Sequence, residues 1–140
     1  MIRIIHEYNS KDNLPKFQTG DIISHKKYRY CGVIVHIDPI FQGEENWYLS
    51  NQTQPNKEQP WYFVLVNGNQ QVTYVAEKNL HPYNSANPIV HPMLNLFFSG
   101  FDAKLNRYIR NGVPWNPGEP PDAPPPLPPP NFKPPSPPAF

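Results

Sequence analysis

Proline is distributed very unevenly along this chain, and that distribution constrains the fold more than any other feature. Of its 21 prolines, 14 lie in the 27 residues from Pro114 to Phe140, and the other seven are spread over residues 1–113. Proline has no backbone N–H donor and fixes its own φ angle, so a segment this rich in proline does not form a helix or a sheet. We therefore expect one folded body followed by a Pro-rich tail.

The same pattern divides the chain into three parts. Residues 1–15 are mostly polar and are predicted to be a flexible lead-in. Residues 16–111 are predicted to form one domain, because a body of about a hundred residues can bury a modest core without disulfides. Residues 112–140 form the Pro-rich tail, which has no apolar periodicity and is expected to stay extended or disordered.

Charge and cysteine content exclude several classes of protein. Residues 1–113 hold 11 Lys and Arg against 9 Asp and Glu, so the body carries a net charge of only +2. A single cysteine, Cys31, cannot form an intrachain disulfide or a cysteine-rich zinc site, which favours the cytoplasm or the nucleus. The first residues do not form a signal peptide, and no apolar run approaches the length of a membrane span, so we expect no membrane association.

Short apolar runs bounded by turn residues indicate strands. Residues 22–25 and 31–37 are rich in β-branched side chains and are separated by a polar cluster, which predicts an antiparallel pair. Residues 61–66 are the strongest predicted strand. The Asn67-Gly68 pair after them is a strong hairpin signal, and residues 72–76 are predicted to return from it.

The remaining segments predict little helix. The connection over residues 38–60 is too long for simple coil, and residues 43–49 could form a short helix within it. Residues 77–80 suggest a single turn. Residues 93–98 follow Pro92, a residue that favours the first turn of a helix, and predict a helix of two turns. Four short strands, one long loop and a terminal helix favour a small barrel-like β domain.

No catalytic or metal-binding motif is present. The histidines lie too far apart in sequence to place two imidazoles on one metal. They are His6, His25, His36, His81 and His91. Cys31 heads an apolar strand and is predicted to be an inert core thiol. We expect no metal, no cofactor and no enzymatic activity.

A basic, aromatic cluster near the first predicted hairpin is the best candidate binding site. With one lysine from the start of the domain, its members are Lys16, His25, Lys26, Lys27, Arg29 and Tyr30. Cations can contact phosphates and aromatic rings can stack on bases, so the cluster is a candidate contact surface for double-stranded DNA. The competing interpretation is an exposed hairpin tip whose lysines protect a sheet edge from aggregation.

The tail contains a second candidate binding site. A run of prolines interrupted by one leucine is predicted to populate the polyproline II helix, which loses little entropy on docking into aromatic grooves such as those of WW and SH3 domains. The candidate contact residues are Pro124, Pro125, Pro126, Leu127 and Pro128. The alternative is a spacer without a partner.

Four ordered blocks of the body resemble a known family. They are residues 17–28 (FQTGDIISHKKY), 30–39 (YCGVIVHIDP), 59–66 (QPWYFVLV) and 74–80 (YVAEKNL). Together they are similar to the YccV-like domain, also called the hemimethylated DNA-binding or HspQ family. The continuation over residues 91–109 resembles the version found in certain eukaryotic F-box only proteins, although the F-box itself is not in this sequence.

The resemblance implies a fold and two functions. The fold would be all-β, a small SH3-like barrel, to which the sequence adds a short C-terminal helix and a disordered Pro-rich tail. Bacterial members are associated with binding hemimethylated DNA and with modulating a Lon-type protease. We therefore expect a non-catalytic DNA-binding module. The alternative is a protein-interaction adaptor in protein quality control, with a protease or ubiquitin-pathway protein as partner and the tail recruiting a WW or SH3 domain.

Overall fold

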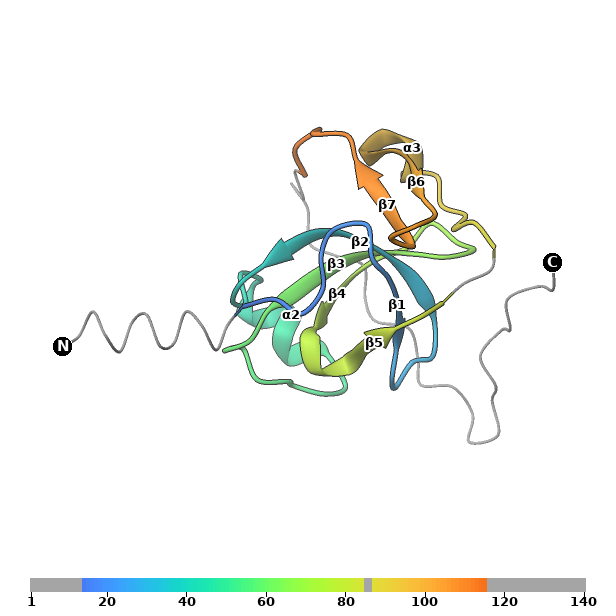
Figure 1. Ribbon diagram of the computed structural model, residues 1–140. Coiled ribbons are helices and arrows are strands. Elements are labelled where there is room, and N and C mark those ends of the chain that lie inside the picture. Colours follow the sequence, from blue (N-terminus) through green and yellow to red (C-terminus); the bar gives the residue numbers. More distant parts are fainter. Residues whose placement is uncertain (1–13, 85–86, 116–140) are drawn as a thin grey trace.

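The structure, a computed structural model, describes residues 14–84 and 87–115, and their secondary structure is mostly β (Figure 1). In chain order the elements are β1 (Ile22–His25), β2 (Cys31–Asp38), α2 (Glu45–Ser50), β3 (Trp61–Val66), β4 (Val72–Ala76), the 3₁₀ turn η1 (Glu77–Asn79), β5 (Leu80–Pro82), α3 (Leu94–Phe97), β6 (Phe98–Asp102) and β7 (Arg107–Arg110). No helix among these residues is long and apolar enough to cross a membrane. The expectation of an all-β fold is confirmed.

Five strands form one antiparallel sheet in the order β4-β3-β2-β1-β5. In the β1–β2 hairpin Ile23 lies opposite Gly32, and in the β3–β4 hairpin Val64 lies opposite Thr73. Both predicted hairpins are therefore confirmed. The β3–β4 connection turns at Gly68, whose φ of +88° is a conformation that glycine adopts without strain.

The sheet curls into a small barrel. A bulge in β2 after Ile34 increases its local bend. At the tip of the β1–β2 hairpin, the Tyr30 hydroxyl lies 2.6 Å from the hydroxyl of Thr73 on β4, which is the far end of the sheet order. The Lys26 amide donates to the Asn79 carbonyl over 2.7 Å. The first contact ties the hairpin tip to the opposite edge of the sheet and closes the barrel, and the second extends the β1–β5 pairing.

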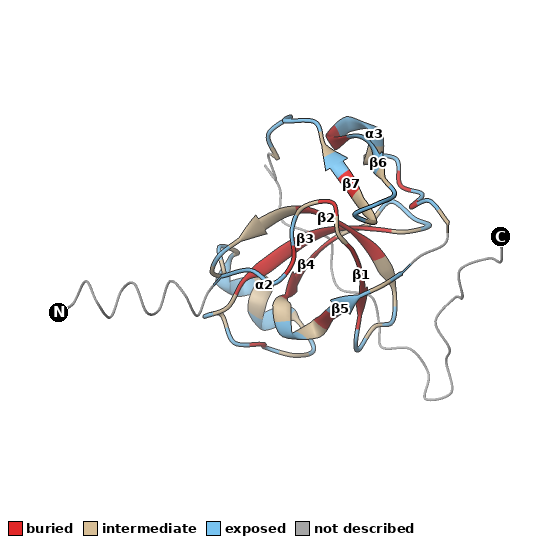
Figure 2. Cartoon of the chain, viewed as in Figure 1, coloured by how far each residue is buried: buried red, intermediate tan, exposed pale blue. Residues whose placement is uncertain are grey.

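Strand β3 is buried on both faces, as Figure 2 shows by its red ribbon. Its six residues are all apolar, so no polar face is available to meet water. The side chains on one face belong to a cluster of Phe17, Ile23, Ile34, Tyr62, Val64, Val75 and Leu80. Those on the other face belong to a larger cluster that includes Val33, Val35, Trp61, Phe63, Leu65, Tyr74, Phe97, Phe98 and Tyr108. Two layers of core therefore meet at this strand.

The long β2–β3 connection covers part of the larger cluster. The short helix predicted for residues 43–49 is present as α2 over Glu45–Ser50. Ahead of it, the Phe41 ring lies 4.9 Å from the Trp61 ring, and the Lys57 ammonium lies 4.5 Å from the centre of the Tyr48 ring. Lys57 is also ion-paired with Glu45. The connection is thus packed onto the barrel through its aromatic side chains.

The C-terminal part of the body differs from the sequence-based expectation. The predicted two-turn helix has only four residues, and it runs directly into the β6–β7 hairpin, for which the sequence predicted no strands. The helix ends because Phe98 adopts an extended conformation, with φ −128° and ψ 138°, and pairs with Arg110. Phe97 and Phe98 are both buried, so packing overrides the local helical signal.

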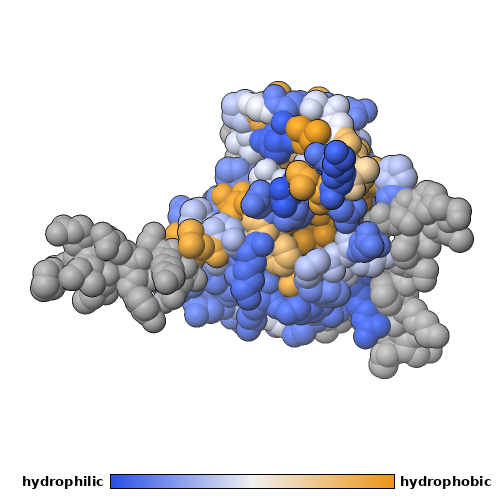
Figure 3. Space-filling model, in the orientation of Figure 1, coloured by the Kyte–Doolittle hydropathy of each residue, from blue (hydrophilic) through white to orange (hydrophobic). Residues whose placement is uncertain are grey.

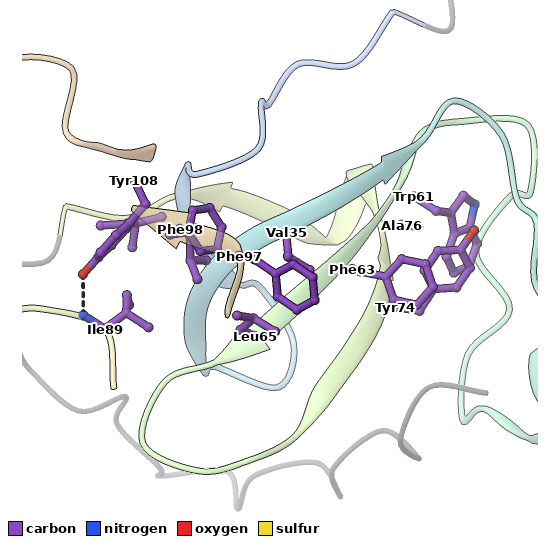
Figure 4. Close-up of a cluster of buried hydrophobic side chains, with 12 residues drawn as sticks. Val35, Trp61, Phe63, Leu65, Tyr74, Ala76, Ile89, Phe97, Phe98 and Tyr108 are labelled. Carbon is purple, nitrogen blue, oxygen red and sulfur yellow. Dashed lines mark hydrogen bonds between the residues drawn. The ribbon is translucent and has the colours of Figure 1, made fainter. Parts of the chain in front are cut away.

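Contacts with the segment before β1 dock the β6–β7 hairpin onto the barrel. The Tyr108 amide donates to the Gly20 carbonyl over 2.9 Å, and the Arg107 guanidinium pairs with the Asp21 carboxylate over 2.8 Å. The Tyr108 hydroxyl accepts a hydrogen bond from the Ile89 amide, the dashed line in Figure 4. Figure 1 shows the hairpin seated beside the barrel rather than in the sheet.

Replacing Gly20 by alanine tests this docking contact. Gly20 has φ +92°, and an added Cβ would lie 1.9 Å from the Tyr108 carbonyl oxygen. We expect Gly20→Ala to lower the free energy of unfolding by clearly more than the roughly 1–2 kcal/mol that a left-handed alanine alone costs. Chemical denaturation followed by circular dichroism measures the loss.

The matched control is Gly68→Ala. Gly68 has a similar φ of +88° but nothing within 4 Å of an added Cβ. This variant therefore carries only the conformational cost, about 1–2 kcal/mol. Equal losses in the two variants would contradict the assigned role of the Gly20–Tyr108 approach.

Candidate nucleic-acid interface

A tight four-residue turn presents the basic cluster predicted from the sequence. It spans residues 26–29 and is closed by two backbone hydrogen bonds, from the His25 amide to the Tyr30 carbonyl over 2.8 Å and from the Arg29 amide to the His25 carbonyl over 2.9 Å. Arg29 takes the left-handed conformation, with φ 65°, that reverses the chain. The Lys26, Lys27 and Arg29 side chains are exposed. The turn thus holds three cations at the barrel surface.

His25 lies inside this turn. It is 4% exposed, and its Nδ1 accepts hydrogen bonds from the backbone amides of Lys27 over 3.0 Å and Tyr28 over 2.9 Å. Burial, together with the charges of Lys27 and His81, lowers the pKa of His25 to about 4. The ring is therefore neutral at neutral pH and shapes the turn, so we leave it out of the phosphate-contacting set.

Tyr30 has a similar internal role. Its hydroxyl is bonded to Thr73, its ring lies 5.3 Å from the His25 ring, and burial raises the pKa of its hydroxyl. The Tyr28 ring lies 4.7 Å from the same imidazole and is half-buried. The Tyr30 ring, which the sequence analysis placed in the candidate DNA-contacting set, therefore serves mainly to close the barrel.

The fold brings Lys16 near the same region and adds a further cation. The Lys16 amide donates to Glu77 Oε2 over 2.8 Å at the start of η1, while the Lys26 amide bonds to Asn79 at its end. Lys78 lies between them and is exposed. Sequence reasoning missed Lys78 because residues 74–80 were interpreted as barrel core.

We call this set of exposed cations the basic surface. Its members are Lys16, Lys26, Lys27, Arg29 and Lys78. One carboxylate, Glu77, lies beside it and accepts hydrogen bonds from the Tyr62 hydroxyl and the Lys16 amide. In Figure 3 hydrophilic side chains cover most of the lower part of the barrel, and apolar patches lie higher, where the β6–β7 hairpin meets the barrel.

Metal ligation and thiol chemistry are the two other kinds of site to compare with the basic surface among the described residues. Within residues 14–84 and 87–115 no group of three His, Cys, Asp or Glu side chains is placed to hold a metal ion. Cys31 is half-buried, and burial raises the pKa of its thiol. The Cys31 sulfur accepts a weak hydrogen bond from the Asn67 side-chain Nδ2 over 3.6 Å. A protonated thiol is a poor nucleophile.

The neutral state of His25 predicts an acid-sensitive turn. Its pKa is about 4 in the folded protein against 6.5 in the unfolded chain, so the unfolded state binds the proton first as pH falls. The stability from neutral His25 is complete above pH 6.5 and is lost as pH falls toward 4, by about 2 kcal/mol at pH 5. Urea unfolding at pH 5 and pH 7.5 measures it.

The control for that measurement is His25→Asn. The asparagine oxygen can still accept from the turn amides but does not titrate. We expect the variant to lose about 2 kcal/mol less than the wild type between the two pH values. The same drop in both proteins would show that another group carries the pH dependence.

One protein-family model matches most of the folded body. Residues 15–105 match the family described as hemimethylated DNA-binding protein YccV like. The matched segment covers 91 of the 140 residues, runs from just before Lys16 through β5, and ends in the β6–β7 hairpin. It includes every residue of the basic surface. The chain belongs to the YccV-like family of hemimethylated DNA-binding proteins.

Proposed function

We propose that this protein is a non-catalytic module that binds double-stranded DNA through its basic surface, with hemimethylated duplex as the preferred target. The observation that carries the proposal is the exposed cationic turn over residues 26–29, held in one conformation by a buried neutral His25. Cations on a rigid turn can contact phosphates without first being ordered. Family membership supplies the class of ligand.

The modest net charge of the body sets the strength expected of this binding. A net charge of +2 over residues 1–113 attracts DNA weakly at long range, so affinity has to come from the local cluster. Lysine and arginine contacts to phosphates release counterions and are therefore sensitive to salt. The proposal thus describes a short-range contact that is strong only at low salt.

A salt titration tests the phosphate contacts. If about four phosphates are neutralised, the slope of log K against log salt is near −3.6, so affinity falls on the order of a hundredfold from 50 to 200 mM salt. The double variant Lys26→Ala/Lys27→Ala should weaken binding and reduce the magnitude of the slope by about 2. Fluorescence anisotropy with a labelled duplex gives both quantities.

Two comparisons make the titration decisive. Lys104→Ala removes an exposed lysine from the β6–β7 turn, away from the basic surface, and should leave affinity and slope unchanged. Matched unmethylated, hemimethylated and fully methylated duplexes then separate general DNA binding from methylation sensing. No binding at 50 mM salt rejects DNA as the ligand, and equal binding to all three duplexes rejects the hemimethylation preference alone.

An adaptor role is the second candidate, and the β6–β7 hairpin supports it. Phe101, Leu105 and Ile109 are large apolar residues that are at least 44% exposed on this one hairpin. Large apolar side chains exposed on one short element can be covered by a protein partner. In this version the hairpin or the barrel would hold a protease or ubiquitin-pathway protein.

The WW or SH3 part of that candidate depends on residues 124–128, which lie outside the described residues. Affinity purification with and without residues 114–140 tests it, and a Phe101→Ser/Ile109→Ser variant tests the hairpin. An unchanged set of partners in both experiments would reject the adaptor role. The proposal places the protein in the cytoplasm or nucleus, supported by its single free thiol, Cys31.

A further inference from the structure

Tyr28 is the one member of the turn over residues 26–29 that carries no charge. Its neighbours in the turn are Lys26, Lys27 and Arg29, which are exposed members of the basic surface. Tyr28 is partly exposed at the same hairpin tip, which lies at the lower end of the barrel in Figure 1. The cations account for phosphate contacts, so the turn holds one further side chain whose role those contacts leave open.

The buried His25 holds the Tyr28 ring in place. The ring centres of the two residues lie 4.7 Å apart, and the Tyr28 amide donates to His25 Nδ1 over 2.9 Å. His25 is itself fixed, because it is 4% exposed and its ring also contacts the Tyr30 ring at 5.3 Å. A side chain that is ordered before binding loses less conformational entropy when a ligand arrives. Tyr28 thus has the rigidity expected of a recognition residue.

Tyr28 also stands at the border between charged and uncharged surface. In sequence it lies between the exposed cations Lys27 and Arg29, and in space it lines a small half-open cleft. The described lining of this cleft includes Trp47 and Tyr74 and contains no Asp, Glu, Lys or Arg. The cleft is too small to hold a nucleobase, so a DNA ligand can meet only the exposed part of the Tyr28 ring.

A hemimethylated duplex differs from the unmethylated one by a single methyl group. Cytosine C5 and adenine N6 both face the major groove, where thymine presents its own methyl group. A methyl group has no charge and no hydrogen-bonding atom, so a lysine or arginine that contacts a phosphate does not detect it. Apolar contact is the direct way to read it. Discrimination therefore requires an apolar surface among the cations.

Among the described residues of the hairpin tip, Tyr28 provides that surface. His25 is buried beneath the turn, and the Tyr30 hydroxyl is bonded to Thr73 and closes the barrel. Leu14 is the alternative, because it is 64% exposed and precedes Lys16 by two residues. It lies outside the turn, however, whereas Tyr28 is part of it. The methyl contact is therefore assigned to Tyr28, and Leu14 supplies a control.

The shape of the hairpin tip suits the major groove. The major groove of B-DNA is about 12 Å wide and admits a two-stranded β-ribbon. Strands β1 and β2 form such a ribbon, and the turn over residues 26–29 joins them directly. Because cations flank Tyr28 on both sides in sequence, phosphate contacts can hold its ring over the base edges of the groove.

We propose that Tyr28 is the specificity-determining residue of the basic surface and that its ring contacts the methyl group of a hemimethylated duplex in the major groove. This role rests on the proposed function, which supplies the duplex and the phosphate contacts. Different side chains then perform the two tasks, since the cations hold the DNA backbone and the tyrosine reads the methyl group. Loss of the ring removes the preference for methylated DNA without removing binding.

The test measures affinity at low salt by fluorescence anisotropy, for the wild type and for Tyr28→Ala. The labelled duplexes are unmethylated, hemimethylated at cytosine C5 or hemimethylated at adenine N6, which separates the two sources of the methyl group. We expect the wild type to bind a hemimethylated duplex about fourfold more tightly than the unmethylated one, the effect of burying one methyl-sized group. Tyr28→Ala should bind both equally and keep the wild-type salt dependence, because the cations remain.

Further variants separate recognition from support of the turn. Tyr28→Phe keeps the ring and should keep the preference, and Leu14→Ala removes an exposed apolar side chain outside the turn and should also keep it. If Tyr28→Ala does not give the wild-type circular dichroism spectrum, Tyr28→Asn replaces it, because asparagine is favoured in turns. A purely structural role of Tyr28 would weaken binding to every duplex by the same factor and leave the ratio of affinities unchanged.

The outcomes separate failure of the methyl contact from failure of DNA binding. Absence of wild-type binding to every duplex rejects DNA as the ligand, and the methyl contact with it. Equal wild-type binding to all duplexes rejects methyl recognition and leaves DNA binding intact. A preference that persists in the folded Tyr28→Ala or Tyr28→Asn variant overturns the role of Tyr28 alone, and a preference lost in Leu14→Ala places the methyl contact outside the turn.

Discussion

Burial of β3 on both faces is the constraint on which the rest of this structure depends. Trp61–Val66 has six consecutive apolar side chains, and each fully buried one contributes about 1.5–3 kcal/mol through the hydrophobic effect. One layer of core cannot cover both sides of a strand, so a second layer has to come from elsewhere in the chain. The β2–β3 connection and the C-terminal segment supply that second layer.

The candidate sites follow from this arrangement. Curling the sheet around β3 brings the β1–β2 hairpin tip to β4, through the bond between Tyr30 and Thr73, and holds the cations of the turn at the surface. Packing the β2–β3 connection against Trp61 places Trp47 beside Tyr74 and leaves a cleft next to the same hairpin. A cationic surface and an uncharged aromatic cleft are therefore neighbours, with the hairpin tip as their shared wall.

Sequence reasoning identified the strands that have a clear local signal. Residues 22–25, 31–37, 61–66 and 72–76 combine β-branched or aromatic composition with turn residues at their ends, and each is a strand in the structure. The β6–β7 hairpin was not predicted. Its strands are short and mostly exposed, and the residues just before β6 have a local preference for helix. Their pairing depends on docking against Gly20 and Asp21, which lie more than 80 residues earlier in sequence.

The candidate interface was predictable in its charges and not in its geometry. Lys26, Lys27 and Arg29 could be selected because a hairpin tip exposes its side chains whatever the rest of the fold does. The inward position of His25 could not be predicted, since it depends on which ring nitrogen meets the turn amides and on burial by the closing barrel. Lys78 joins the basic surface only because η1 is bonded to the hairpin.

The sequence by itself determined that the chain has one β-rich body, a Pro-rich tail, a cationic hairpin and the pattern of a known family. These properties are local, because composition, alternation and turn chemistry act over a few residues. Only the tertiary structure decided that two core layers enclose β3, that His25 is neutral, and that Trp47, Trp61 and Tyr74 meet in one cleft. Those properties depend on contacts between residues far apart in the chain, which a local pattern does not encode.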